Sequence, residues 1–315
     1  MKTNNQKKIL SALLALTVLP FSSKAATIYS TGNDTLNYCV NNTSSSYKTI
    51  ADNISIKTGD TVSVITSRYS EWTGKVTGKG TLNILSGGER TYIGTQKKKG
   101  SDYPDWTGHT GDVHIYPYKE VVSSCGFYGL VLHSGTFQPD NISGSNYNKL
   151  FEKNRVVVHN GATIAIEAGT RGIRIGELET ETGSSLTGYY KKSSAISYYI
   201  IGGKNSNAEL AGKIYNSASG NKVGIIKEGT GTYVISGTNN DINGGIRLTK
   251  GTLLIENDIE KTKAENGSGA TGKYGSVIVY EDAILGGNGS IASATEVYGS
   301  IKPANNSLGT LYFTD

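Results

Sequence analysis

The stretch EGTGTYVISGTNNDINGGIRLTKGTLLI, residues 228–255, decides the expected fold of this chain. A glycine-centred turn at Glu228-Gly229-Thr230 precedes a short strand of alternating character, and a second such unit begins at Lys250-Gly251. Alternating and β-branched residues are typical of strands, and glycine suits tight corners because it tolerates positive φ. The stretch therefore predicts short strands that are joined by tight corners.

Units of this kind recur through the second half of the chain. They begin at Asn160, Thr182, Asn207, Glu228, Lys250 and Glu281, with a weaker unit at Tyr298. Most steps lie near 22 residues, and the longest contains the polar segment 258–275. One coil of that length cannot bury its apolar residues, whereas stacked coils share a continuous core. The spacing predicts an all-β parallel β-helix (a β-solenoid) with loop insertions for residues 151–315, and an antiparallel sandwich is the competing fold.

Residues 26–150 are less regular than the second half. One segment, residues 78–88, matches the later units. We interpret this region as capping coils of the same solenoid with longer insertions, and a separate small β-domain is the alternative.

Residues 1–25 carry the pattern of a secretory signal peptide. A basic start is followed by the apolar run Ile9–Phe21 and by small residues before a cleavage site after Ala25. This run is too short to span a bilayer, and no later stretch is long enough for a transmembrane helix. The same 25 residues hold four lysines and no acid, so they account for most of the formal charge of +5. The mature chain is therefore nearly neutral and has no basic footprint for nucleic acid.

The segment 229–255 resembles the autotransporter-associated β-strand repeat, also called the passenger-associated transport repeat. The residues that carry the resemblance are Gly229–Thr232, Ser236–Asn239, the pair Gly244-Gly245 and Gly251–Leu253. Segments 285–291 and 301–311 look like the unit that often follows, with Pro303-Ala304-Asn305 where a Pro-Gly-Asn turn is usual. The resemblance implies a right-handed parallel β-helix in a secreted or outer-membrane-displayed bacterial protein, and it brings no catalytic residues.

Aromatic residues are the main candidates for contacts with a ligand. Tyrosine occurs 20 times against 5 phenylalanines, and exposed rings can stack on sugars or anchor a protein partner. The candidate contacts are Trp106, Tyr116, Tyr118, Tyr189 and Tyr199. Strand propensity and stacking inside the solenoid are the alternative explanation. Cys39 and Cys125 could pair in an oxidising compartment or remain two free thiols.

A row of carboxylates is the second candidate feature. Glu177, Glu179 and Glu181 alternate, so a strand places all three on one face. Such a row could bind Ca²⁺ or supply the acid and base for glycan cleavage. The simpler interpretation is a solvated outer strand with Arg171 and Arg174 as counterions.

Metal and cofactor motifs are missing from the sequence. His109 and His114 lie five positions apart, which puts them on opposite faces of a strand and does not match a helical zinc motif. Residues 239–244 copy the start of an EF-hand loop, but Lys250 stands where the loop needs glutamate. We therefore predict no catalytic residue, no metal site and no cofactor.

Together these patterns predict an exported, non-enzymatic β-helix that serves as a surface scaffold or adhesin, with glycans or cell-surface proteins as partners. The alternatives are a β-helix polysaccharide lyase or glycosidase, since such enzymes share the architecture, and a carbohydrate-binding module. The chain ends in a strand-like run at residues 309–315. Because an uncapped solenoid end invites aggregation, we expect either that further coils or an export domain follow it or that the chain is a truncated copy.

Overall fold

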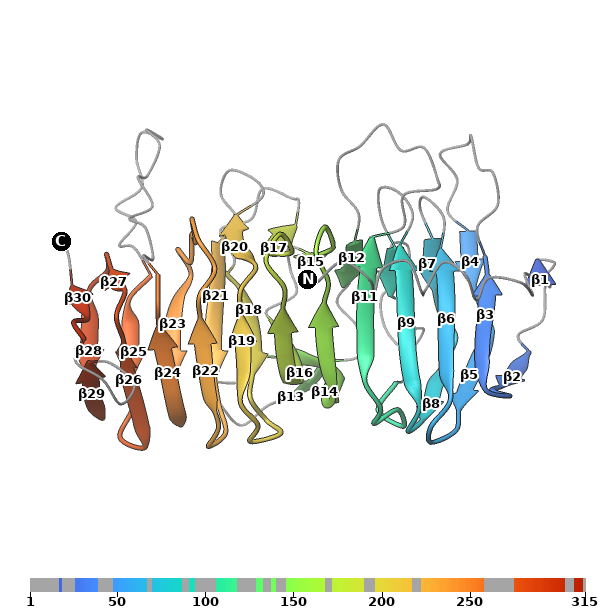
Figure 1. Cartoon of the computed structure of the whole chain (residues 1–315), viewed down its shortest axis with the longest axis horizontal. Coiled ribbons are helices and arrows are strands. Elements are labelled where there is room, and N and C mark those ends of the chain that lie inside the picture. The colour runs from blue at the N-terminus through green and yellow to red at the C-terminus, as the bar shows by residue number, and fades with distance from the viewer. Residues whose placement is uncertain are drawn as a thin grey trace, which may run out of the picture.

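The computed structural model of the chain describes residues 17–18, 26–38, 48–66, 70–86, 91–93, 106–117, 129–132, 137–139, 146–167, 172–189, 196–216, 222–257, 275–303 and 309–313. Within these ranges the chain forms strands, turns and bends and no helix. Most strands pair in parallel with a strand one coil later, which arranges them in three rows along the long axis of the molecule (Figure 1).

The first row runs almost the whole length of the molecule. It contains β3 (Asn33–Asn37), β6 (Thr61–Thr66), β9 (Thr81–Ser86), β11 (Val113–Pro117), β14 (Asn146–Val158), β16 (Gly172–Thr180), β19 (Ala208–Leu210), β22 (Thr232–Ile235), β24 (Gly251–Ile255), β26 (Ala283–Gly287) and β29 (Ser300–Pro303). A short strand β1 (Thr17–Val18) pairs with β3 at the N-terminal end of this row.

The other two rows complete each coil. The second row follows the beginning of β16 with β18 (Ile196–Ile201), β21 (Lys222–Lys227), β23 (Gly245–Leu248), β25 (Val277–Val279) and β28 (Thr295–Val297). The third row contains β4 (Lys48–Ile50), β7 (Ser70–Trp72), β10 (Thr91–Ile93), β12 (Gly129–Leu132), β15 (Thr163–Glu167), β17 (Ser185–Tyr189) and β20 (Lys213–Asn216).

Smaller sheets lie at the two ends. β2 (Thr27–Tyr29), β5 (Asn53–Ile56) and β8 (Val76–Gly78) form a three-stranded parallel sheet, and β27 (Ser290–Ile291) pairs with β30 (Tyr312–Phe313). The one antiparallel pairing in the described part of the chain joins β13 (Phe137–Pro139) to the start of β14. Parallel strands stacked coil upon coil make the fold a parallel β-helix, in agreement with the sequence prediction.

Parallel pairing places equivalent side chains above one another, and this builds the core. One buried column contains Leu36, Val64, Ile84, Ile115, Val158, the polar Thr180, Leu210, Ile235 and Ile255. Because successive strand residues face opposite sides, the intervening residues of the same strands lie on the outer face. The alternation seen in the sequence therefore separates the core from the surface.

Aromatic rings fill the interior near the N-terminal part. The rings of Trp72 and Trp106 meet edge to face at 4.9 Å, and Phe151 packs on Trp106 at 5.8 Å. The indole Nε1 of Trp106 donates to the Gly74 carbonyl over 3.0 Å. This bond satisfies the polar atom of a side chain that is only 1% exposed.

The C-terminal interior holds polar side chains that bond to the backbone. The Tyr199 hydroxyl lies 2.8 Å from the carbonyl oxygens of Ile164 and Thr187 and accepts from the Thr187 amide over 3.1 Å. The Tyr233 hydroxyl accepts from the Leu178 amide over 3.0 Å. Burial raises the pKa of both phenols, so both stay protonated. From the interior, the hydroxyl groups of these tyrosines therefore form hydrogen bonds with backbone groups of strands in other coils.

Lys227 is also buried and donates to three carbonyl oxygens. Its Nζ lies 2.8 Å from the carbonyl of Glu228, 2.9 Å from that of Gly229 and 3.2 Å from that of Lys250 on the next coil. The ammonium also lies 5.4 Å from the ring centroid of Tyr233. Burial lowers the pKa of Lys227 to about 8, and the charge of Glu228 opposes this shift.

Two corner residues explain the glycine and asparagine pattern. Gly229 has a φ of +71°, and a Cβ there would meet the Gly202 carbonyl oxygen at 2.0 Å. Asn205 has a φ of +59°, and its side-chain oxygen accepts from the Thr230 amide of the next coil over 2.9 Å. Positive φ and close approach to the neighbouring coil therefore both restrict the corners.

The repeat seen in the sequence mixes two kinds of corner. The turns at Asn160 and Thr182 lie between the first and third rows, whereas those at Asn207 and Glu228 lie between the second and first rows. Register steps also vary, since Val156 pairs with Leu178, 22 positions later, but Val113 pairs with Val156, 43 positions later. Coil length is thus less regular than the predicted period of about 22.

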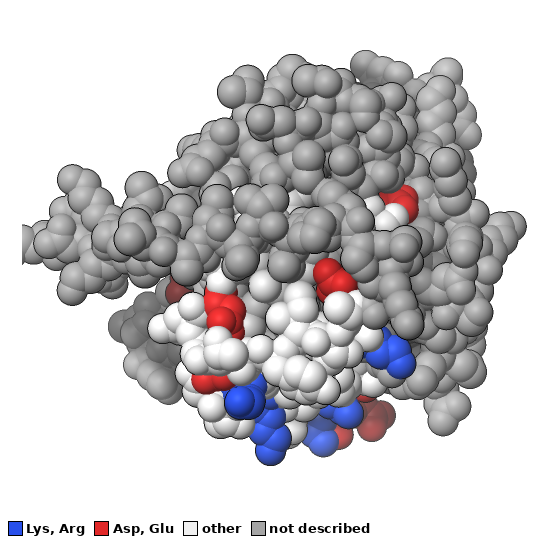
Figure 2. Space-filling view, turned by 90° about the vertical axis from the view of Figure 1, so that its right-hand side faces the viewer, with Lys and Arg blue, Asp and Glu red and all other residues white. Residues whose placement is uncertain are grey.

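In residues 26–150, the strands β3, β6, β9 and β11 continue the first row, and β4, β7, β10 and β12 belong to the third row. β9 pairs with β11, and β11 pairs with β14, all in parallel. Figure 2 looks at the N-terminal end of the solenoid, where described acidic and basic side chains are both present with uncharged residues between them. In the described residues, no helix is long and apolar enough to cross a membrane.

Candidate functional site

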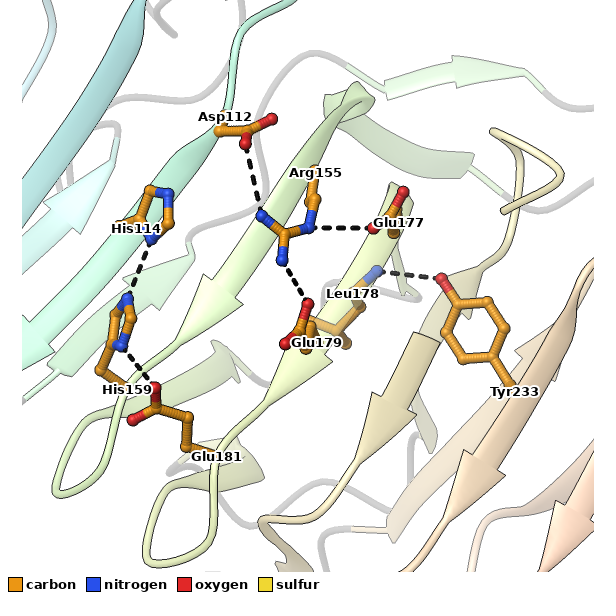
Figure 3. A network of polar contacts seen from close by, with 9 residues as sticks. All are labelled: Asp112, His114, Arg155, His159, Glu177, Leu178, Glu179, Glu181 and Tyr233. Carbon is orange, nitrogen blue, oxygen red and sulfur yellow. Dashed lines mark hydrogen bonds and ion pairs between the residues drawn. The ribbon is translucent and has the colours of Figure 1, made fainter. Parts of the chain in front are cut away.

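The outer face of three consecutive first-row strands gathers charged and imidazole side chains (Figure 3). We call this set the polar ladder; it consists of Asp112, His114, Tyr116, Arg155, His159, Glu177, Glu179 and Glu181. Parallel register explains the gathering, because Arg155 lies opposite Glu177 and Val157 lies opposite Glu179. Every second residue of each strand faces outward, so the three strands present their polar residues side by side.

Arg155 links three carboxylates from two neighbouring strands. Its Nη1 lies 3.3 Å from Asp112, its Nε 3.0 Å from Glu177 and its Nη2 2.5 Å from Glu179. Its side chain is 32% exposed and that of Glu177 is 12% exposed. Burial would lower the pKa of Arg155, but the bond to Glu179 and the nearby carboxylates outweigh it and raise the pKa. The guanidinium therefore remains charged and offsets one of the three negative charges around it.

A second chain of contacts runs from imidazole to imidazole to carboxylate. His114 Nδ1 lies 2.9 Å from His159 Nε2, and His159 Nδ1 lies 2.9 Å from Glu181 Oε1. The other oxygen of Glu181 accepts from the Asn160 amide over 2.9 Å. Burial lowers the pKa of His114, and the positive charge of His159 adds to this effect. In addition to the backbone pairing of their strands, the three coils are thus linked by an unbroken chain of side-chain contacts (Figure 3).

Tyr116 stacks on this chain. Its ring lies 4.0 Å from that of His159 with an angle of 5° between the planes, and the His114 ring lies 5.2 Å from that of His159. Burial, followed by the charge of Glu181, raises the pKa of Tyr116. One face of the tyrosine ring is covered by imidazole and is not free to stack on a sugar.

Most charged side chains of the polar ladder form ion pairs or hydrogen bonds with other members of the ladder. Glu177 and Glu179 both bind the same guanidinium. Across the described residues, no group of three histidine, cysteine or carboxylate side chains is placed to hold a metal ion. Chemically, the arrangement can exchange protons at its imidazoles and tie adjacent coils together.

The structure corrects the predicted counterions of the glutamate row. The three glutamates do lie on one outer face, but Arg155 binds two of them. Arg174 instead places Nη1 2.8 Å from Glu228 in the second-row corner. Arg171 lies outside the described residues. The prediction is wrong for Arg174, because it considered residues near in sequence, whereas parallel stacking brings Arg155 beside glutamates one coil later.

The aromatic candidates divide into buried and unplaced residues. The prediction of surface contacts is wrong for Trp106 and Tyr199, which are 1% and 0% exposed and belong to the core. Tyr116 is half-buried in the polar ladder. Tyr189 ends β17, and its side chain lies outside the described part, as do Tyr118, Cys39 and Cys125.

His109 and His114 lie in different surroundings. His109 is buried, and its Nε2 lies 2.9 Å from the Gly80 carbonyl, while its Nδ1 lies 3.0 Å from the Asn154 amide nitrogen. An Nε2–H tautomer satisfies both contacts. Burial lowers its pKa although the bond to Gly80 opposes this shift, so His109 serves as a neutral interior bridge.

Sequence reasoning missed Arg155 and His159. The sequence did contain a signal for this pairing. Arg155 and His159 are four positions apart, so they fall on the same face of a strand, and each stands 22 positions before a glutamate, Glu177 or Glu181. This spacing equals the expected coil length. Applying the period to charged residues as well as to turns would have paired them.

A scan of protein-family models found no match to the chain, and a search of the curated proteins found no similar sequence. The likeness to the autotransporter-associated repeat therefore depends on the motif residues of the segment 229–255 and the units that follow it.

Proposed function

We propose that the chain is an exported, surface-displayed β-helix that acts as a non-enzymatic scaffold or adhesin. The observation that supports this most directly is the polar ladder, in which carboxylates and imidazoles from three coils bind one another. Such contacts between coils would stabilise an elongated solenoid. They also engage Glu177 and Glu179, the carboxylates that resemble an acid and base pair, in ion pairs with Arg155. The signal-peptide pattern of residues 1–25 and the repeat resemblance support export.

Expression of the full chain in a Gram-negative bacterium tests export. We expect the N-terminal sequence of the mature protein to begin at Ala26, and protease added to intact cells should digest the displayed chain. The variant Ala25→Arg is the matched control, because a bulky charge at the cleavage position blocks processing. Retention of uncleaved wild-type chain in the cytoplasm would contradict the proposal.

A β-helix lyase or glycosidase is the second candidate, since Glu177 and Glu179 lie side by side on an outer face. Incubation of the purified chain with pectin, alginate and mucin decides between the two. We expect no release of reducing or unsaturated ends. Activity that disappears in Glu177→Gln or Glu179→Gln, while Glu209→Gln keeps it, would favour the enzyme.

A carbohydrate-binding module would instead bind glycans without cleaving them. Tyr116 is the suitable residue to vary because it lies in the polar ladder, whereas loss of Trp106 would disturb the core. Binding on a glycan array that is lost in Tyr116→Ala but kept in Tyr116→Phe would indicate contact with the ring.

A further inference from the structure

The pairing of β11 with β14 is a seam between the two parts of the solenoid. Val113 and Val156 are paired although 43 positions separate them, the longest step between first-row neighbours. Three register pairs join the two strands. On the outer face, the side-chain links across this seam are the Asp112–Arg155 ion pair, the His114–His159 hydrogen bond and the Tyr116–His159 stack. On the buried side, the Asn154 amide donates to the carbonyl oxygens of His109 and Gly111, and these bonds carry no titratable partner.

The hydrogen-bonded chain His114–His159–Glu181 can accept only a limited number of protons before one of its hydrogen bonds is lost. In its neutral form, His159 Nδ1–H donates to Glu181, and His159 Nε2 accepts from Nδ1–H of His114. One added proton is tolerated, since a charged His159 donates at both nitrogens and His114 changes tautomer. A second added proton places two N–H groups and two positive charges face to face across 2.9 Å.

Charged groups on every neighbouring strand bear on this pair. Asp112 and Glu179 favour the protonated form of His114, whereas Arg155 and the charged form of His159 disfavour it. Tyr116 covers the His159 ring, and Asn83 faces His114 from β9. On the far side, Glu209 of β19 bonds to Ser236 of the next coil. Arg155 is already engaged by three carboxylates, so its charge stays when the pH falls.

Access for protons comes from the outer face. The His159 side chain is 18% exposed and that of Glu181 is 47% exposed. His114 is half-buried, and burial lowers its pKa.

We propose that His114, His159 and Glu181 form a pH-sensitive staple, and that a second proton on the imidazole pair opens the seam between β11 and β14. The staple holds the two parts of the solenoid together at neutral pH. Mild acid removes the His114–His159 bond and separates the rings, so the seam loosens before the rest of the first row.

Hydrogen exchange on the full-length chain tests the staple between pH 7.5 and 5.0. The His159 amide bonds to the Ile115 carbonyl over 3.0 Å and reports on the seam. After correction for intrinsic rates, we expect its opening to increase by up to about tenfold per pH unit once the pH falls below the pKa that His114 has in the opened seam, because only the closed seam disfavours the second proton. The pairing of β22 with β24, which contains no histidine, is the internal reference and should change little.

Two variants separate the staple from general acid effects. His114→Gln keeps a hydrogen-bonding group but cannot take up a proton, so the seam should show no acid-driven opening in this range. Glu209→Gln is the matched control, and it should open like the wild type. Parallel changes at the seam and the reference, or an unchanged response in His114→Gln, would overturn the proposal.

Nitrogen-15 spectra of the histidine rings in the wild-type chain give an independent readout. At high pH we expect Nδ1–H tautomers in both His114 and His159, followed by two separate protonation steps as the pH falls. Independent titration of both rings at one shared pKa would rule out the staple even if the variants failed to fold.

Discussion

Tyr199 and Lys227 inside the solenoid bond to the backbone, whereas Arg155 and His159 of the polar ladder bond to other side chains on its outer face. Inside, Tyr199 and Lys227 each reach two or more carbonyl oxygens. Outside, Arg155 and His159 reach the side chains of neighbouring coils. Buried backbone groups have no water to replace a lost partner, while partly exposed ion pairs have water and salt as competitors.

Removal of a polar partner should therefore change the free energy of unfolding by different amounts in the two regions, even for similar residue types. Removal of an interior partner leaves a buried carbonyl or amide unsatisfied. Removal of a ladder partner leaves a charge that water can still reach. Stability should therefore depend more on the interior groups and sensitivity to solution conditions more on the ladder.

The largest effect is expected from Trp106→Ala. The change empties a packed interior site and removes the bond to the Gly74 carbonyl, so the free energy of unfolding should fall by about 3–5 kcal/mol. Denaturant unfolding measures this loss. Trp106→Phe, which keeps a ring against Trp72, should lose clearly less, and equal losses would show that packing contributes little here.

Because of Lys227, we expect the free energy of unfolding to rise with pH in the weakly alkaline range. Its folded-state pKa of about 8 lies below the ordinary value of 10.5, so between these values the unfolded chain binds more protons and folding is favoured as pH rises. We expect a gain of about 2 kcal/mol from pH 8 to 9.5. Lys227→Met should show no such rise; a wild-type curve that is flat or falls over this range would refute the assignment.

Tyr199→Phe tests the interior at the level of a single hydroxyl. The variant leaves the Thr187 amide and two carbonyl oxygens without this partner, which should cost about 1–3 kcal/mol. Thermal or denaturant unfolding provides the measurement. The adjacent Tyr198→Phe is the matched control, because Tyr198 is half-buried and bonds to the Gly244 carbonyl only over 3.4 Å; a larger loss there would reverse the expected order.

Arg155→Gln should have the smallest effect on stability at ordinary salt, about 1 kcal/mol, because the ion pairs are partly exposed. The difference between variant and wild type should shrink as salt rises, since salt screens exposed charges. Unfolding in low and high sodium chloride gives this comparison. A loss as large as that of Tyr199→Phe, independent of salt, would remove the distinction between the two regions.

Much of the fold could be read from the sequence because its signals are local. Alternation at residues 232–235 predicts which side chains face the core, and Gly229 predicts a corner with positive φ. The candidate site was less accessible. Glu177 to Glu181 were identified as one face, but Arg155 was not identified as their partner because its distance from them is one coil.

The aromatic residues show the limit of composition as evidence. Trp106 and Tyr199 carry polar atoms, and the sequence does not say whether water or the backbone satisfies them. The interior supplies Gly74, Ile164 and Thr187 as partners. Burial of these side chains therefore depends on contacts that close only when coils stack.

The sequence alone determined that strands alternate, that corners need glycine or asparagine, and that stacked coils must bury their apolar columns, since these follow from backbone geometry and local pattern. Only the tertiary structure decided which coil lies against which. Arg155 and Glu177 stand one regular period apart, but Asp112 and Arg155 meet across 43 positions. Insertions of variable length separate paired strands along the chain, and coil packing sets the register that brings the polar ladder together.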